Sequence, residues 1–275
     1  MFSVVFGQPA PTELQALTPF LQVGPGSIWA NLFWLVVVFL LMLVLNRWIT
    51  LHVNGLGLLL SGSQGVATWL YFFLFLPGIL IHELSHYLIA ILLRARPGKF
   101  TLWPQSRRGR VVLGSVEVRT DNPLVHSLIG VAPLVFGSLA VWLIAQFLRF
   151  DQLAEAASSG SLEQLFRVLG DILITPDFWL WLYLLFAIAN AMMPSPADRL
   201  YWRPVLLFFG GIGLLLVGLG LTPDIPPIFE DIFANIIAVL VFALTTVVVV
   251  DLLFMAIILA AELILSLVTR RRIQY

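Results

Sequence analysis

Residues 66–93 read VATWLYFFLFLPGILIHELSHYLIAILL, an apolar run that carries one acidic residue, Glu83, between two histidines, His82 and His86. A helix needs about 20 apolar residues to cross the roughly 30 Å hydrocarbon core of a bilayer. The run therefore predicts a membrane-spanning helix with three ionisable side chains inside it. Such groups are unfavourable in lipid and by default mark a functional site.

The composition of the whole chain agrees with this interpretation. Apolar residues make up 60% of the sequence and charged residues only 11%, whereas a soluble domain is about 45–50% apolar and about 25% charged. So few polar groups cannot cover a surface in water, and the surface must therefore face lipid. We expect the lipid bilayer to be a partner of this chain and nucleic acid not to be one.

Six apolar segments are long enough to cross a bilayer, which predicts an all-α polytopic membrane protein. The expected spans are residues 28–49, 66–93, 124–148, 178–193, 204–221 and 232–268. The last must tilt, bend or extend into water, and a re-entrant piece could form over 56–65. We divide the chain into an N-terminal segment with one span (1–65), a core (66–203), and C-terminal helices with a basic tail (204–275).

Basic residues gather in particular connections between the expected spans. The segment between the second and third spans holds seven of the fifteen: Arg94, Arg96, Lys99, Arg107, Arg108, Arg110 and Arg119. Arg199 and Arg203 lie in another connection, and Arg270 to Arg272 close the chain. Because cytoplasmic loops carry an excess of Lys and Arg, we expect these connections in the cytoplasm. Six spans would then place both termini there.

The basic segment also contains a predicted β-hairpin, over 99–120. Residues 99–103 and 111–120 have strand character, and Arg107-Arg-Gly109 suits the turn between them. We expect this hairpin at the cytoplasmic interface, beside the helix of residues 66–93.

His82 and His86 are four residues apart, so both imidazoles project from one helix face. This spacing lets two nitrogens reach one Zn²⁺, while Glu83 approaches the open position of the metal. Glu83 would be the general base toward the attacking water and would later protonate the leaving amine. We therefore expect one zinc ion per chain.

Zinc requires a third protein ligand, and the absence of cysteine restricts the choice to His, Asp or Glu. Asp198 follows two prolines that break the end of a span, so its side chain could turn inward. It could equally be an interfacial aspartate paired with Arg199. Asp251, deep in the last span, and Glu262, near its end, are the alternatives.

Two further polar residues are candidates for contact with a substrate. Asn190 could bind the substrate or the oxyanion, or it could only join helices by hydrogen bonds. His126, at the start of the third span, could serve either of the first two roles or be an ordinary interfacial histidine. His52 lies in a polar connection, where we expect it to be solvated.

The combination of the HExxH span, the following hairpin and the later Asn190…Asp198 segment with Pro194 and Pro196 resembles the site-2 protease family of intramembrane zinc metalloproteases. The resemblance covers residues 66–203 and includes the small-residue segment 130–138. It implies that His82, His86 and Asp198 bind zinc and that Glu83 is the catalytic base. It further implies that the strand of residues 111–120 receives an extended peptide by β-augmentation.

We expect a membrane-embedded protein substrate, cleaved near the cytoplasmic face, and a compact chain of this kind suits a prokaryotic cell membrane. Other functions remain open from the sequence. A prenyl-protein-type protease would use Glu262 as the third ligand. A transporter could relay ions through Glu83, His86 and Asp251, although such proteins often show paired broken helices. A catalytically inactive scaffold is the fourth hypothesis, and the intact HExxH motif argues against it.

Overall fold

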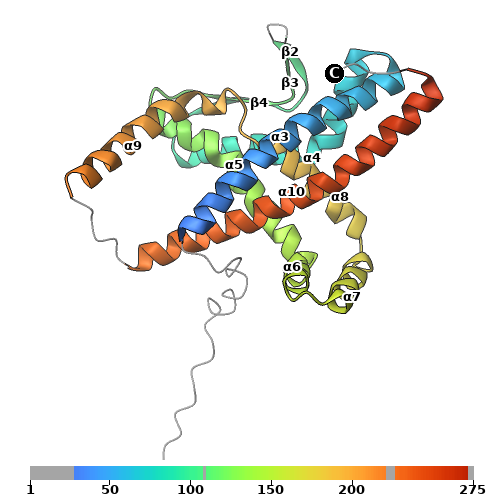
Figure 1. The fold of residues 1–275 in the computed structure, drawn as a ribbon. Helices are drawn as coiled ribbons and strands as arrows, with labels where there is room; N and C mark the ends of the chain where they lie inside the picture. The colour runs from blue at the N-terminus through green and yellow to red at the C-terminus, as the bar shows by residue number, and fades with distance from the viewer. Residues whose placement is uncertain (1–27, 108–109, 221–226, 272–275) are drawn as a thin grey trace, which may run out of the picture.

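The computed structural model describes residues 28–107, 110–220 and 227–271, and it is mostly helical with a small antiparallel hairpin, as expected (Figure 1). The helices are α3 (Ile28–Ser61), α4 (Gln64–Leu92), α5 (Pro123–Phe147), α6 (Phe150–Ser158), α7 (Leu162–Leu173), α8 (Phe178–Ala191), the short 3₁₀ helix η1 (Asp198–Tyr201), α9 (Trp202–Gly218) and α10 (Pro227–Thr269). The strands are β1 (Pro97–Thr101), β2 (Gln105–Arg107), β3 (Arg110–Val112) and β4 (Ser115–Val118). Residues 1–27 of the expected N-terminal segment, and Arg108 and Gly109 of the expected turn, lie outside the described residues.

Four helices are long and apolar enough to cross a membrane, namely α3, α4, α5 and α10. A fifth span exists if α7 and α8, bent by 93° at their junction, count as one. The expected six spans are not confirmed, because residues 204–218 belong to α9, a helix of 17 residues that is not among these candidates. Residues 56–61 continue α3 as regular helix and do not re-enter the membrane separately.

The two longest helices, α3 and α10, lie side by side and run in the same direction (Figure 1). The Trp34 indole donates to the Thr245 hydroxyl over 3.2 Å, and further along His52 Nδ1 lies 2.7 Å from Glu262 Oε2. The sequence separations of these pairs are 211 and 210 residues. A constant separation means that the helices are parallel and stay in register.

This parallel arrangement decides where the basic groups lie. Arg271 lies against Gly62, in the turn that joins α3 to α4. Arg94 and Arg96 follow the other end of α4. The expectation that the basic tail shares a side with segment 94–122 is therefore not met. If α7 and α8 together make a fifth crossing, the two ends of the described chain lie on opposite sides.

The hairpin does not stay at the end of α4 but runs back along it. Phe100 packs on Tyr87, with ring centroids 5.9 Å apart, and Trp103 reaches Phe72, also at 5.9 Å. Trp103 also contacts Trp69, in the second turn of the helix, at 6.1 Å. These α4 residues share one helix face with Glu83. The hairpin was expected at the interface, but its aromatic side chains find their apolar partners along the length of the span.

The core is centred on α8, which packs among α4, α5 and α10. Its Leu185, Phe186 and Ala187 are completely or almost completely buried. Phe75 of α4 packs on one side of the Phe186 ring, and Phe254 of α10 stacks on it at 3.9 Å. This packing fixes the C-terminal end of α8 beside the HExxH motif of α4.

Candidate metal centre

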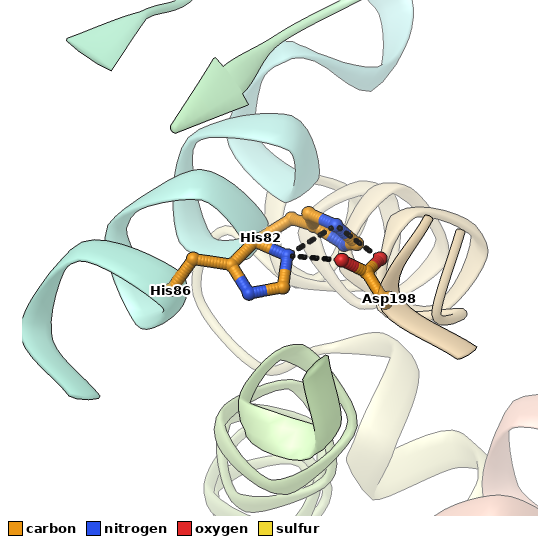
Figure 2. A group of neighbouring side chains, drawn as sticks. All are labelled: His82, His86 and Asp198. Atoms are coloured by element: carbon orange, nitrogen blue, oxygen red, sulfur yellow. Dashed lines mark hydrogen bonds and ion pairs between the residues drawn. The ribbon is translucent and has the colours of Figure 1, made fainter. Parts of the chain in front are cut away.

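His82 and His86 project from one face of α4, as their spacing predicts (Figure 2). Their Nε2 atoms lie 3.2 Å apart. Asp198, the first residue of η1, directs its carboxylate at both rings. Its Oδ1 lies 3.2 Å from Nε2 of His86, and its Oδ2 lies 3.7 Å from Nε2 of His82. These three residues form a group that could hold a metal ion.

Two backbone carbonyl oxygens orient the histidine rings. The carbonyl of Ala191, at the end of α8, lies 2.7 Å from Nδ1 of His82, and the carbonyl of Ile129 in α5 lies 2.9 Å from Nδ1 of His86. A carbonyl oxygen only accepts hydrogen bonds, so each Nδ1 must carry the proton. In the neutral imidazoles, each Nε2 then presents a lone pair. Two lone pairs and a carboxylate at these distances repel one another unless a metal cation or a proton lies among them.

The prolines after α8 explain why a carbonyl is available for His82. In a continuing helix, the carbonyls of Asn190 and Ala191 would accept from the N–H groups four residues later. Pro194 has no N–H, and the N–H of Ser195 instead donates to Asp198 Oδ2 over 2.6 Å. The carbonyl of Ala191 is thereby free to orient His82, and the same turn holds Asp198 in place.

Asp198 is kept as an anion in this arrangement. Burial alone would raise the pKa of its carboxyl group. The hydrogen bonds and positive charge that protonated His82 and His86 would supply in the metal-free site, together with a bond involving Ser195, hold this pKa well below its ordinary value. The backbone of Asp198 also packs tightly against α5, because a Cβ at Gly130 of α5 would collide with the Asp198 carbonyl. A carboxylate in a fixed position suits a metal ligand.

Glu83 lies beside the histidines and is only 7% exposed. The hairpin passes over it at Gly114, between β3 and β4, and a Cβ there would lie 2.7 Å from the Glu83 Oε1. The strand expected over 111–120 is interrupted at this crossing. A cavity of about 620 Å³ joins Glu83 to His82, His86 and Asp198, with residues 112–116 as one wall and Asn190 in another.

Asn190 sits in a buried polar network that joins three helices. Its Nδ2 donates to Asp251 Oδ1 of α10 over 2.7 Å and to the Phe186 carbonyl over 3.0 Å. Asn46 of α3 donates to the Asn190 carbonyl, also over 2.7 Å. Asp251, the alternative third ligand, therefore lies behind Asn190, whereas Asp198 is brought to the histidines.

The remaining candidates lie elsewhere. His126 Nε2 is 2.8 Å from the Thr120 carbonyl, at the base of the hairpin. Glu262 pairs with His52, whose ring stacks on Trp48 at 3.8 Å. His52 was expected to be solvated, but it lies within α3 and is part-buried.

Sequence reasoning missed Asn46 and Gly114. Asn46 could have been found as a polar residue inside an apolar span. Gly114 could have been found as a glycine within a predicted strand.

Comparisons with protein-family models, with curated proteins and with solved structures found no match to this chain. The resemblance to site-2 proteases consequently rests on the residues themselves, and the function is argued from the site.

Proposed function

We propose that this chain is an intramembrane zinc metalloprotease that hydrolyses peptide bonds of membrane-embedded protein segments. The observation that carries the proposal is the convergence of two imidazole Nε2 atoms and one carboxylate, with both Nδ1 atoms bonded to carbonyl oxygens. Metal-binding histidines commonly have their second nitrogen held in this way.

The distances among the three donors favour zinc. Ligand atoms about 2.0–2.1 Å from zinc at tetrahedral angles lie roughly 3.3–3.4 Å from one another. The two Nε2 atoms lie 3.2 Å apart, close to this value, and they approach different oxygens of the Asp198 carboxylate, at 3.2 and 3.7 Å. Calcium and magnesium prefer oxygen ligands, which makes a site with two imidazoles unsuitable for them. Three protein ligands would leave one position open, as in catalytic zinc sites.

Glu83 is the residue that would move protons in this reaction. A bound zinc ion would supply Lewis-acid chemistry, polarising a carbonyl and making a water more acidic. The Glu83 carboxylate would accept a proton from the attacking water and later deliver it to the nitrogen of the leaving amine. The crossing hairpin, which covers Glu83 from one side, would limit access of bulk water to this step.

The substrate-binding element would be the hairpin wall of the cavity. Among the described residues, β4 pairs only with β1 and β3 only with β2, so each keeps one unpaired edge. Residues 112–116 line the same cavity as the metal-binding group. An extended peptide could add to this edge through main-chain hydrogen bonds. The substrate would be a transmembrane segment that unwinds locally.

The site would open toward the cytoplasm. Leu92, the last residue of α4, comes six positions after His86, which is about 9 Å of helix. Arg94 and Arg96 follow this end of α4, and the bias of basic residues toward cytoplasmic loops supports the orientation.

The proposal is tested by metal content and cleavage together. We expect purified protein to contain one zinc per chain by mass spectrometry, and His82→Ala or Asp198→Ala to lose most of it. Glu83→Gln should keep the metal and abolish cleavage of a transmembrane peptide in proteoliposomes.

His126→Ala is the matched control for metal content, because its ring lies against the Thr120 carbonyl and His126 is not one of the three residues of the donor group. Normal cleavage by Glu83→Gln would refute the proposed mechanism. Full zinc content in Asp198→Ala would refute the proposed ligand set.

A further inference from the structure

Asn190 has a restricted hydrogen-bonding capacity at the wall of the cavity. A carboxamide offers two N–H donors on its nitrogen and acceptor lone pairs on its oxygen. Both donors are used, one by the Phe186 carbonyl and one by Asp251 Oδ1. The Asn190 side chain can therefore accept a further hydrogen bond through Oδ1, but it has no N–H left to stabilise an oxyanion.

The orientation of this carboxamide is determined by its two partners. The Phe186 carbonyl oxygen and the Asp251 carboxylate oxygen both require a donor. If the nitrogen and oxygen of the Asn190 carboxamide were exchanged, an oxygen would face another oxygen at both contacts. On the oxygen side, Nδ2 of Asn46 lies 3.4 Å from Oδ1, which is long for a hydrogen bond. That nitrogen makes its shorter bond, of 2.7 Å, with the Asn190 carbonyl.

A contribution to stability alone does not explain why an aspartate occupies position 251. It is 1% exposed, and among the described residues its Oδ2 has no hydrogen-bond partner. A buried oxygen without a partner is unfavourable, and an apolar residue at this position of α10 would avoid it. The contact that Asp251 does make is the one that orients Asn190.

We propose that Asp251 is a positioning residue, which holds the Asn190 carboxamide so that its oxygen accepts a hydrogen bond from a backbone N–H of a bound peptide. Asn46 supports the same geometry by tying the Asn190 carbonyl to α3. This inference rests on the proposed function, since it assigns a substrate contact within the same cavity. It also assigns Asn190 to peptide binding and not to the oxyanion.

The experiment measures peptide affinity without turnover. The probe is a fluorescein-labelled synthetic peptide with about 20 apolar residues and a central Gly-Pro pair. Its dissociation constant is measured in nanodiscs by anisotropy, with every variant in the Glu83→Gln background. Asp251→Ala and Asn190→Ala should each weaken binding about tenfold, the loss expected for one hydrogen bond.

A double-mutant cycle separates positioning from a general structural effect. If Asp251 acts through Asn190, the double variant should bind like Asn190→Ala alone. Asp251→Asn, which retains an acceptor oxygen, should restore affinity to within about threefold of the background. Val250→Ala is the matched control, because it truncates a neighbouring buried side chain of α10 without removing a hydrogen bond. It should leave the affinity unchanged.

The outcomes distinguish this inference from the function on which it rests. Equal affinity of Asp251→Ala and the background, or a double variant whose loss is the product of the single losses, overturns the positioning role and leaves the protease proposal standing. A failure of the Glu83→Gln background itself to bind the peptide overturns both.

Discussion

Gly114 marks the closest approach of the hairpin to Glu83. A methyl group on its Cα would lie 2.7 Å from both Cγ and Oε1 of Glu83, which is too near for real Cβ contacts. A Cβ here would force the Glu83 side chain or the hairpin to shift. This single position connects the hairpin to Glu83, the proposed general base.

We predict that Gly114→Ala keeps the metal but reduces peptide cleavage about a hundredfold, because displacing a catalytic group by about 1 Å can have an effect of this size. Zinc content and cleavage rate, measured on the same preparation, test this. Gly170→Ala in α7 is the control, since a Cβ there meets nothing within 4 Å, and it should be neutral or mildly stabilising. Cleavage at the normal rate by Gly114→Ala would contradict the proposed crossing.

The end of α8 is the element that builds the candidate metal centre. Pro194 leaves the Asn190 carbonyl without its helical donor, and Ser195 gives its N–H to Asp198. The last two carbonyls of the helix then serve Asn46 and His82. A helix that continued regularly would take both carbonyls back into its own hydrogen bonds.

We predict that Pro194→Ala lowers zinc affinity about tenfold, because loss of an outer-shell partner of a metal ligand typically reduces affinity 10–100-fold. The alanine N–H would favour one more turn of helix and move Ser195 and Asp198. Competition with a chelator, read by metal analysis, gives the affinity. Pro123→Ala at the first position of α5 is the control, because its missing N–H has no helical partner in any case. Unchanged affinity in Pro194→Ala would show that the helix end does not depend on this proline.

At the scale of the whole molecule, the parallel pair of α3 and α10 decides the topology. Arg271 lies near the turn between α3 and α4, and Arg96 follows the opposite end of α4. The basic residues are therefore divided between the two ends of the bundle. Counting apolar segments could not show this, since a short apolar helix such as α9 resembles a span in sequence.

We predict that Arg96→Cys and Arg271→Cys react with a membrane-impermeant maleimide from opposite sides of sealed vesicles. The chain has no cysteine, so each variant carries a single thiol and the unmodified chain is the blank. Both side chains are exposed in the structure. Labelling of both from the same side would require a sixth crossing and would restore the arrangement expected from the sequence.

The sequence by itself determined the class of protein and the core of the site. Apolar content and run length depend on the solvent that each segment prefers, so the membrane-spanning character of α4 could be predicted locally. The placement of His82, Glu83 and His86 on one face follows from helical periodicity alone. These properties involve residues within a few turns of one another.

Only the tertiary structure decided how this motif is completed. Asp198, Asp251 and Glu262 were alternatives because each is an acidic residue far along the chain, and the packing of α8 against α4 and α5 decides which of them meets the histidines. The contacts of Gly114 with Glu83 and of Asp251 with Asn190 depend on the same packing. The physical reason is that hydrogen bonds and steric contacts between distant segments depend on ångström-scale positions, which no local pattern of residues encodes.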